Sequence, residues 1–429
     1  MKIGVIGYGV EGRAAVEYWG ARGEVVVHTR ELKSEAPPGV SVVTGPGYLD
    51  DLDDYDLLIR SPGVRPDLLP DGVATTTVIA EFFARCPATI VGVTGTQGKG
   101  TTCTVATAIL KAAGRRVQLG GNIGVVPLQF LADMTAEDIV VLELSNFQLI
   151  DLPSSPQVAV VLPITPDHLN WHSDLDEYHQ AKSAIAAWQK PDDTVVFDSA
   201  NEVASRIAES SPGRKIPLRS PEGVEVRDSA IYVRGERVLE VSKIPLRGKH
   251  NVDNVAAAVA ATFDLISGDL AALQRGVSGL HPLPYRLEPI ADVAGVTYVN
   301  DSLSTTPETT MAAMAAYPET KVLILGGSSK GVSYEALAAA VARDAGSIRT
   351  TLLIGQDGPK IAEALDATGF SNHQFVPGSM AEVVNVAARV AQSGDVVLLS
   401  PACASFGAFR DYADRGDQFV AAVRELPEA

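Results

Sequence analysis

The sequence is poor in cysteine and in aromatic residues, and it has fewer basic than acidic residues. Its 429 residues include three cysteines (Cys86, Cys103 and Cys403), 6% aromatic residues, and 35 basic against 52 acidic residues, for a net charge of −17 at pH 7. The cysteines have no zinc, redox or disulfide spacing, which favours a reducing compartment. The net charge argues against broad binding to nucleic acid or to anionic membranes. An anionic ligand must therefore be held by local groups.

Long apolar runs are absent as well. No run reaches membrane-spanning length, and Met1 leads directly into an expected strand at Lys2 to Ile6, which leaves no room for a signal peptide. A composition of 46% hydrophobic and 20% charged residues is typical of globular proteins. We therefore expect a cytoplasmic, monomeric protein that binds neither nucleic acid nor membranes.

Short apolar strands alternate with helical segments along the chain, which predicts an α/β fold with parallel sheets. The length favours about three domains. We place a Rossmann-like domain at residues 1–86, a central P-loop-type ATPase domain at 87–284 and a second Rossmann-like domain at 285–429. Residues 214–241 resemble a hairpin, with a turn at Gly235-Glu236.

A glycine-rich segment after the expected strand at 88–93 indicates a nucleotide phosphate loop. Glycines let backbone N–H groups surround an anion at a helix N-terminus, Lys99 adds a full positive charge, and the hydroxyl of Thr101 or Thr102 can hold Mg²⁺. The spacing differs from the standard loop, because only two residues separate Gly95 from Gly98. The loop consists of Gly95, Thr96, Gln97, Gly98, Lys99, Gly100, Thr101 and Thr102.

A second glycine pattern, Gly7, Gly9 and Gly12, follows the first strand. This spacing suits a diphosphate at a helix N-terminus. A nicotinamide enzyme would need an acidic residue at the end of the next strand, where this chain has His28-Thr29-Arg30. A diphosphate of another nucleotide is therefore the better interpretation.

Three polar residues follow expected strands or lie on the helix at 175–189. Glu143 ends the strand at 139–142, His168 follows Asp167 after the strand at 158–162, and Lys182 lies on that helix. A carboxylate at the carboxyl end of a strand beside a phosphate loop is well placed for Mg²⁺. His168 is a metal candidate, whereas Lys182 taken alone would be a surface lysine.

Together these motifs resemble the Mur ligases, cytoplasmic enzymes that build the UDP-linked muramyl peptide of bacterial peptidoglycan. The resemblance covers essentially the whole chain and is strongest to the glutamate-adding members. The motifs that carry it are Thr94–Thr102, Gly120–Gly124, Glu143–Gln148, Thr165–His168, Ala181–Lys182, Gly248–Asn251, Pro284–Arg286, Asn300–Ser302, Gly326–Lys330 and Ser400–Ser405.

The resemblance implies an ATP-dependent, ADP-forming ligase that adds glutamate to UDP-N-acetylmuramoyl-L-alanine through an acyl phosphate. Such phosphoryl transfer depends on positioning and charge neutralisation. Lys99 would neutralise ATP oxygens, Thr101 and Glu143 would hold one Mg²⁺, and His168 and Lys182 would serve a second. In that family a lysine at the position of Lys182 is carbamylated by CO₂. The implied catalytic residues are Lys99, His168 and Lys182.

Further roles are implied by the same resemblance. Besides the phosphate loop, the residues expected to bind ATP are Asn251, Asn254, Arg286 and Asp301. The residues expected to bind the UDP-linked substrate are Gly9, Val10, Thr29, Arg30, Ser61, Gly63, Asn122, Ser145 and Gln148. The residues expected to bind the amino acid are Leu303, Thr305, Lys330, Ser405 and Tyr412.

The expected amino-acid pocket departs from the family pattern. The D-glutamate enzymes typically read Asp-Ser-Lys-Ala-Thr where this chain has Asp301-Ser302-Leu303-Ser304-Thr305. The missing lysine grips a glutamate carboxylate, and a hydrogen bond to a charged group contributes about 1.5–3 kcal/mol. We therefore favour L-glutamate as the substrate, with D-glutamate, held through Lys330 and Tyr412, as the alternative.

Three other functions fit the sequence less well. A folylpolyglutamate synthase has a similar phosphate loop but lacks an N-terminal G-x-G-x-x-G domain. A non-catalytic nucleotide-binding protein would not need Glu143, His168 and Lys182 together. An NAD(P) oxidoreductase would rest on Gly7, Gly9 and Gly12 alone.

Overall fold

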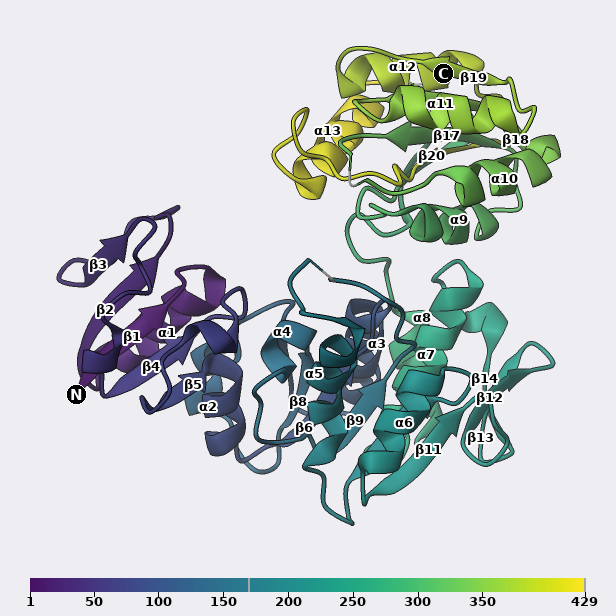
Figure 1. The fold of residues 1–429 in the computed structure, drawn as a ribbon. Coiled ribbons are helices and arrows are strands. Elements are labelled where there is room, and N and C mark those ends of the chain that lie inside the picture. The colour runs from purple at the N-terminus through teal and green to yellow at the C-terminus, as the bar shows by residue number, and fades with distance from the viewer. Residues whose placement is uncertain (169, 330, 428–429) are drawn as a thin grey trace. The chain divides into compact units, whose positions relative to one another are not determined.

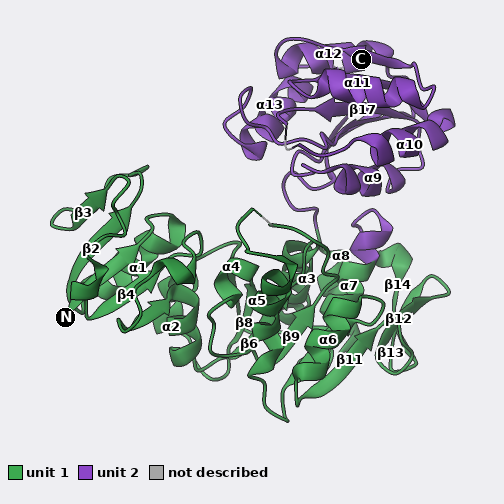
Figure 2. Cartoon of the chain, in the orientation of Figure 1, with its two compact units in different colours: residues 1–244, 253–280 green, residues 245–252, 281–429 purple. Residues whose placement is uncertain are grey.

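The computed structural model describes residues 1–168, 170–329 and 331–427, and it divides into two compact units. Unit 1 comprises residues 1–244 and 253–280, and unit 2 comprises residues 245–252 and 281–429 (Figure 2). Each unit is an α/β structure built on parallel strands (Figure 1). The α/β fold predicted from the sequence is confirmed, while the exact domain boundaries remain a prediction.

Unit 1 begins with a five-stranded parallel sheet in the order β3-β2-β1-β4-β5. The chain leaves β1 for β2 on one side and returns to β4 on the other, so the loop after β1 lies at a switch point, where α/β proteins bind ligands. The elements are β1 (Lys2–Ile6), α1 (Val10–Gly20), β2 (Glu24–Thr29), β3 (Ser41–Thr44), β4 (Leu57–Arg60), β5 (Thr75–Thr77) and α2 (Val78–Arg85).

The second sheet of unit 1 has nine strands in the order β14-β13-β12-β11-β10-β9-β6-β8-β7. Strands β6 to β12 are parallel, and β12, β13 and β14 form an antiparallel meander. The strands are β6 (Thr89–Thr94), β7 (Val117–Gly121), β8 (Ile139–Glu143), β9 (Val158–Val161), β10 (Thr194–Asp198), β11 (Arg214–Leu218), β12 (Val224–Arg227), β13 (Ala230–Val233) and β14 (Glu236–Glu240). The helices are α3 (Lys99–Ala112), α4 (Asn146–Leu149), α5 (Leu175–Ala187), α6 (Glu202–Ser210), α7 (Lys249–Thr262) and α8 (Leu270–Ser278).

The hairpin expected over residues 214–241 begins later than predicted. β11 pairs in parallel with β10, so it belongs to the main sheet, and the hairpins start at β12. Their turns lie at Asp228-Ser229 and at Arg234-Gly235, where all four residues have positive φ. Because β11 is short and partly apolar, its pattern does not distinguish a parallel from an antiparallel partner.

One apolar core joins the two sheets of unit 1. It runs from Ile3 and Trp19 in the first sheet layer through Phe82 to Phe130 and Leu142 in the second. The rings of Phe82 and Phe130 meet edge to face with centroids 5.6 Å apart. The first two predicted domains therefore pack as one body.

Unit 2 carries a six-stranded sheet in the order β15-β16-β20-β17-β18-β19, in which only β15 is antiparallel. Side chains alternate along β17: Leu323 and Leu325 pack with α9, α10 and α11, whereas Val322 and Ile324 pack with α12 and α13. The strands are β15 (Glu288–Val293), β16 (Val296–Asn300), β17 (Lys321–Gly326), β18 (Ile348–Ile354), β19 (His373–Phe375) and β20 (Val396–Leu399). The helices are α9 (Pro307–Ala315), α10 (Glu335–Arg343), α11 (Gly358–Ala367), α12 (Met380–Val390) and α13 (Tyr412–Arg424).

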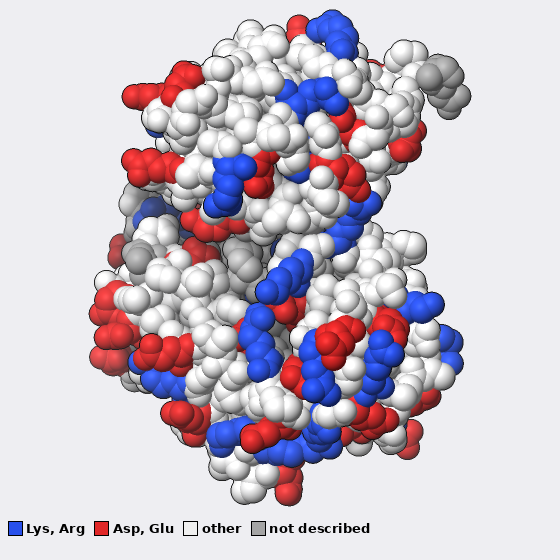
Figure 3. All heavy atoms as spheres, turned by 90° about the vertical axis from the view of Figure 1, so that its right-hand side faces the viewer, with Lys and Arg blue, Asp and Glu red and all other residues white. Residues whose placement is uncertain are grey.

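Charges are mixed on the face of the molecule shown in Figure 3, where lysine and arginine lie among aspartate and glutamate. Ion pairs also occur among the described residues. Asp264, for example, pairs with both Arg214 and Arg234. Within the described residues, no helix combines the length and apolar character needed to cross a bilayer.

Candidate active site

The phosphate loop connects β6 to α3 and requires glycine at two positions. Gly95 and Gly98 have φ of +151° and +84°. A Cβ on Gly95 would lie 2.6 Å from the Leu162 side chain, and one on Gly98 would lie 2.2 Å from Asn254 Oδ1. Gly98 is the N-cap of α3, so the backbone N–H groups of the first helical turn face the loop. The loop therefore has the glycine geometry and the helix N-terminus expected of a phosphate loop, and anion binding there remains a prediction.

The Lys99 ammonium lies over this loop. Its Nζ donates to the carbonyl oxygens of Gly95 and Thr96, at 3.1 and 2.9 Å. Thr101 and Thr102 are buried in the first turn of α3, and Thr102 Oγ1 has no hydrogen-bond partner among the described residues. A cation and unused polar groups at a helix N-terminus fit a phosphate ligand.

Glu143 ends β8 and accepts hydrogen bonds from the loop that follows β7. The Asn122 side chain donates to Glu143 Oε1 at 2.8 Å, and the Asn122 backbone N–H donates to the Glu143 carbonyl at 2.8 Å. A Cβ on Gly121 would lie 2.2 Å from that carbonyl, so only glycine permits the approach. Glu143 is buried and makes no ion pair with a described residue, which leaves Oε2 available to a ligand.

Lys182 is almost completely buried on α5. Its Nζ donates to the Gly95 carbonyl at 3.0 Å and lies 5.0 Å from the ring centroid of Tyr178. Burial and the nearby positive charge of Lys99 lower its pKa to about 7, against the opposing effect of Asp167 and Glu143. Lys99 and Lys182 thus meet at the Gly95 carbonyl, and the charge of Glu143 acts on Lys182, although the three residues are far apart in the sequence.

His168 lies beside this group on the segment that follows β9. Its backbone has a φ of +54°, its N–H donates to Asp167 Oδ1 at 2.8 Å, and its ring contacts the ring of Phe147 edge to face. Burial is the main cause that lowers the His168 pKa, and Lys182 and Lys99 lower it further against the charge of Asp167. A neutral imidazole is the form of histidine that binds metals.

Tyr178 is a site residue that sequence reasoning missed. Its hydroxyl lies 3.0 Å from Thr96 Oγ1 in the phosphate loop, and Thr96 Oγ1 also donates to the Thr165 carbonyl at 3.0 Å. These contacts tie the loop to the segment that carries His168. No sequence pattern singled out Tyr178, because an aromatic residue four positions before Lys182 is also typical of a core helix.

These residues fit one magnesium ion bound together with phosphate. No cluster of three or more His, Cys, Asp or Glu side chains exists in the described part of the chain, so a metal cage made by the protein alone is absent there. Mg²⁺ with a nucleotide needs only one or two protein oxygens besides phosphates and waters. Glu143 and Thr101 can supply them.

The glycine loop after β1 is tightly folded. A Cβ on Gly12 would lie 2.1 Å from the Gly7 carbonyl, and Ser61 Oγ donates to that carbonyl at 2.8 Å. Arg30 is exposed, and the Thr29 hydroxyl donates to the Glu31 carbonyl at 3.1 Å. His28, in contrast, is buried, with its ring nitrogens 2.8 Å from the Tyr48 carbonyl and 2.7 Å from the Tyr55 hydroxyl. His28 is therefore part of the domain core.

Ser145 and Gln148 are expected to bind substrate, but the structure shows both bonded within the protein. Gln148 Oε1 accepts from the Ser145 N–H and hydroxyl, each at 3.0 Å, and forms a capping box at the start of α4. Gln148 Nε2 donates to Glu11 Oε1 on α1 at 2.6 Å. Glu11 Oε2 is buried without a partner among the described residues, and burial raises the Glu11 pKa to about 7.

The residues expected around adenine fall in two units. Asn254 touches the phosphate loop through Gly98 in unit 1. Asn251 belongs to unit 2, where its side chain donates to the Arg247 carbonyl at 2.7 Å.

Asp301 is expected to face ATP, but its carboxylate is buried in unit 2. Oδ1 accepts from the Leu287 N–H at 3.1 Å, and Oδ2 accepts from the hydroxyls of Ser304 and Ser400 at 2.5 and 2.7 Å. Burial raises its pKa to about 6. Arg286 is half-buried, and its charge opposes this rise.

The described residues expected around the amino acid lie in unit 2, on loops or, for Tyr412, at the start of α13. Leu303 is half-buried, and its N–H donates to the Tyr285 carbonyl at 3.1 Å. Tyr412 is exposed, with its ring centroid 5.8 Å from that of Tyr285. Ser405 is buried, and Thr305 is half-buried. Lys330 lies outside the described residues.

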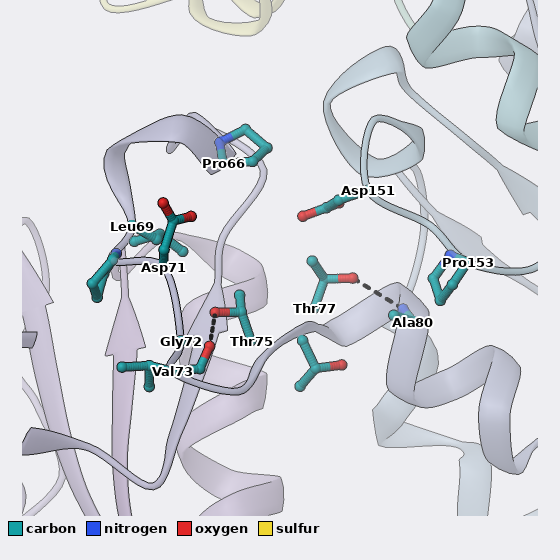
Figure 4. Close-up of a pocket in the computed structure, with 12 residues that line it drawn as sticks. Pro66, Leu69, Asp71, Gly72, Val73, Thr75, Thr77, Ala80, Asp151 and Pro153 are labelled. Atoms are coloured by element: carbon teal, nitrogen blue, oxygen red, sulfur yellow. Dashed lines mark hydrogen bonds between the residues drawn. The ribbon is translucent and has the colours of Figure 1, made fainter. Parts of the chain in front are cut away.

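A separate cavity of about 360 Å³ lies in unit 1 between the segment 66–77 and Asp151 with Pro153 (Figure 4). None of the predicted site residues lines it. The cavity is therefore distinct from the phosphate loop, and Asp151 on its wall is paired with Arg60 at 2.6 Å.

Comparison with known proteins reveals relatives along the whole chain. Residues 93–262 match the Mur ligase middle domain, and residues 285–403 match the Mur ligase glutamate ligase domain. The UDP-N-acetylmuramoylalanine--D-glutamate ligase of Symbiobacterium thermophilum is 37% identical, over 98% of this chain and 97% of the relative. The enzyme of the same name from Clostridium kluyveri is 34% identical, over 99% of this chain and 97% of the relative.

Solved structures show the same fold. UDP-N-acetylmuramate-alanine ligase MurC from Thermotoga maritima aligns with a TM-score of 0.64 at 19% identity and covers 99% of both chains. MurF ligase from Thermotoga maritima in complex with ADP aligns with a TM-score of 0.62 at 16% identity, over 98% of this chain and 93% of that one. With two domain matches and full-length relatives above 30% identity, this chain belongs to the Mur ligase family of ATP-dependent, ADP-forming ligases.

Proposed function

We propose that this chain joins D-glutamate to UDP-N-acetylmuramoyl-L-alanine in the synthesis of peptidoglycan precursors. The observation that carries the proposal is the full-length similarity to enzymes named for that reaction. The sequence favoured L-glutamate instead, and the names of these relatives do not support that preference. The phosphate loop supports the proposal as well, because Lys99 and Lys182 both reach the Gly95 carbonyl and the charge of Glu143 acts on Lys182.

The reaction proceeds in two steps. The carboxylate of the alanyl residue attacks the γ-phosphorus of ATP, which forms an acyl phosphate and releases ADP. The glutamate amine then attacks the acyl carbon, which forms the amide and releases phosphate and a proton. Lys99 stabilises charge on the transferred phosphoryl group, and Thr101 with Glu143 would hold magnesium, which neutralises the phosphate oxygens.

Lys182 is proposed to react with CO₂ and become a carbamate. The environment supports this step, because an amine with a pKa near 7 is substantially neutral at physiological pH and a neutral amine is nucleophilic. A carbamate would convert a cation beside Lys99 into an anionic oxygen ligand. Together with His168 it would then serve a second magnesium ion.

The substrates are proposed to contact loops at the carboxyl ends of strands. Gly9, Val10, Thr29, Arg30, Ser61 and Gly63 would bind the UDP-linked substrate, with Asn122, Ser145 and Gln148 on its peptide side. Asn251, Asn254, Arg286 and Asp301 would bind ATP. Leu303, Thr305, Lys330, Ser405 and Tyr412 would bind glutamate. We also propose that the enzyme is cytoplasmic and monomeric, and sedimentation of the purified chain tests the monomeric state.

L-glutamate is a second candidate because of Leu303. A leucine in place of the family's lysine removes a cation expected to grip a glutamate carboxylate. The loss is compatible with a different pose of the amino acid, as a change of enantiomer requires.

One assay tests both candidates. Purified protein is given UDP-N-acetylmuramoyl-L-alanine, ATP and either enantiomer of glutamate, and amide product and phosphate are measured. We expect turnover with D-glutamate to exceed turnover with L-glutamate. A clear preference for L-glutamate would replace the proposal by the second candidate, and no turnover with either would reject both.

The variant Leu303→Lys tests the basis of this choice. It should increase the preference for D-glutamate by about tenfold to a hundredfold, since a charged hydrogen bond contributes about 1.5–3 kcal/mol. Leu303→Met, which adds no charge, is the control. An unchanged enantiomer ratio in the lysine variant shows that Leu303 does not govern the preference.

A further inference from the structure

Arg415 on α13 is a fully buried guanidinium in unit 2, and none of the described residues pairs with it through a carboxylate. Burying an unpaired charge is costly unless its donors are satisfied. Here Nε donates to Ser302 Oγ at 2.9 Å and Nη2 to the Ser302 carbonyl at 2.7 Å. Nη1 donates to the carbonyls of Cys403 and Ala404 at 3.1 and 3.3 Å. Burial lowers the Arg415 pKa to about 10, so the group stays charged at neutral pH.

The acceptors belong to the segments that carry the amino-acid-binding residues. Ser302 immediately precedes Leu303, and Cys403-Ala404 immediately precede Ser405. Ser302 Oγ in turn donates to the Tyr412 carbonyl at the start of α13, at 2.7 Å. One guanidinium therefore connects the loop after β16, the loop after β20 and the start of α13.

A fourth segment joins this arrangement. The Ala404 carbonyl also accepts from the Ser328 N–H at 2.8 Å, which ties the loop after β17 to the same point. Gly327 in that loop lies so close that a Cβ there would be 3.1 Å from Arg415 Nη1 and 2.2 Å from the Ala404 carbonyl. A side chain at position 327 would therefore collide with the Ala404 carbonyl.

The contacts use the particular shape of arginine. A planar guanidinium presents five N–H donors in fixed directions, whereas a lysine ammonium is a point charge with three donors. Three nitrogens of Arg415 reach four oxygens on two loops. A lysine could keep the charge and some of these contacts, and a methionine could keep only the volume.

We propose that Arg415 is a positioning residue that fixes the loops of the amino-acid pocket relative to one another, and that it thereby sets the affinity for glutamate without touching it. This inference rests on the proposed function, because it takes the loops at 303–305 and 405 and Tyr412 as the glutamate site. Losing Arg415 should weaken glutamate binding more than ATP binding or the first chemical step.

Lys321 offers a matched control in the same unit. It is buried like Arg415, and its Nζ donates to the carbonyls of Tyr317 and Glu319 at 2.7 and 2.8 Å. It begins β17, whereas the loop tied to Arg415 follows the end of that strand. Removing Lys321 therefore removes a buried cation from the domain without removing a contact to the proposed pocket.

The test compares Arg415→Met, Arg415→Lys and Lys321→Met with the unmodified full-length enzyme. Steady-state phosphate release gives kcat and the KM values for glutamate and for ATP. Isotope exchange between ADP and ATP, run with UDP-N-acetylmuramoyl-L-alanine but without glutamate, reports the first step alone. Thermal unfolding reports the stability of each variant.

We expect Arg415→Met to raise KM for glutamate by at least about tenfold, with KM for ATP and the exchange rate within about twofold. The KM of Arg415→Lys for glutamate should lie between the values of the unmodified enzyme and Arg415→Met. Lys321→Met should leave the KM for glutamate unchanged. An unchanged KM for glutamate in Arg415→Met, or an equal rise in Lys321→Met, overturns the inference.

If Arg415→Met does not fold, Arg415→Lys decides the question. A KM for glutamate raised at least about threefold supports the positioning role, and an unchanged KM overturns it. Failure of the unmodified enzyme to use glutamate is a separate result that rejects the proposed function.

Discussion

At the scale of single residues, Lys182 has the environment that its proposed modification requires. Its amine is buried beside Lys99, and its pKa of about 7 leaves much of it neutral at pH 8. We predict that enzyme equilibrated with ¹³CO₂ at pH 8 gives a carbamate signal in its ¹³C spectrum and that this signal weakens below pH 7, where the amine is protonated. Lys182→Ala should lack the signal and lose activity by about 100-fold or more.

Added short carboxylic acids should partly restore the activity of Lys182→Ala, since they can supply the missing anionic oxygen. Lys321→Met, which removes another buried lysine, should keep both the signal and the activity. A signal that persists in Lys182→Ala, or activity that no carboxylic acid restores, would count against the carbamate.

Glu11 predicts a pH dependence of stability in unit 1. The pKa of its carboxyl is raised from 4.5 to about 7, chiefly by burial, with Gln148 and Arg60 opposing the rise. Because the folded state binds this proton more tightly than the unfolded chain does, its stabilising contribution is complete below pH 4.5 and is lost as the pH rises to about 7. At 1.36 kcal/mol per pH unit, the loss is about 3 kcal/mol.

Glu11→Gln should therefore be more stable than the unmodified chain at pH 8 and similar to it below pH 4.5. Chemical denaturation at both pH values measures the difference. Glu17→Gln, an exposed position on the same helix, is the control and should follow the unmodified chain at both. A Glu11→Gln variant with no advantage at pH 8 would show that the carboxylate is accommodated without cost.

At the scale of elements, helix α3 begins and ends beside glycines with different tasks. Gly98 and Gly114 both have positive φ, but a Cβ on Gly98 would collide with Asn254 whereas one on Gly114 would meet open space. Alanine at a positive φ costs about 1–2 kcal/mol. Gly114→Ala should lose about that much stability and keep its affinity for ATP.

Gly98→Ala should lose more stability than Gly114→Ala and should weaken ATP binding by at least about tenfold, since the clash displaces the loop or Asn254. Calorimetric titration with a non-hydrolysable ATP analogue measures the binding. Equal affinities of the two variants for the ATP analogue would mean that the loop can shift without weakening nucleotide binding.

The elements most visible in the sequence are the strands of the parallel sheets. β1, β8 and β20 are apolar runs bounded by polar residues or turns, because both of their faces are covered by helices. The phosphate loop was also predictable, since its glycines meet local backbone demands. β11 was not, because a short strand's pattern does not say which neighbour it pairs with.

Contacts between distant segments were not predictable from the sequence. The bond from Gln148 to Glu11 joins residues 137 positions apart, and the bond from Lys182 to Gly95 joins residues 87 positions apart. No local pattern encodes either pair. Lys182 became a candidate only through the family resemblance, and Arg415 was missed because a buried arginine with carbonyl partners resembles a surface arginine in sequence.

At the scale of the whole molecule, Arg60 helps to join the two sheets of unit 1. It ends β4 with its side chain fully buried, and its Nε and Nη2 donate to the two carboxylate oxygens of Asp151 at 2.7 and 2.6 Å. It also donates to the carbonyls of Val64 and Phe147, at 2.7 and 3.0 Å. This bidentate pair links the end of β4 in the first sheet to the segment that follows α4 beside the second.

Removing one partner of such a pair leaves an uncompensated buried charge, which typically costs about 3–5 kcal/mol. We predict that Asp151→Leu destabilises unit 1 by about that amount, because it leaves the fully buried guanidinium without a carboxylate partner. Arg60→Met should cost less, because the Asp151 side chain is 26% exposed and its carboxylate can be hydrated. The double variant should recover part of the stability lost in Asp151→Leu, since it leaves no unpaired buried charge. Chemical denaturation of all four chains forms the thermodynamic cycle. A coupling energy near zero would mean that the apolar core alone holds the first sheet to the second. The position of the loops proposed to bind the UDP-linked substrate would then depend on Trp19, Phe82 and Phe130.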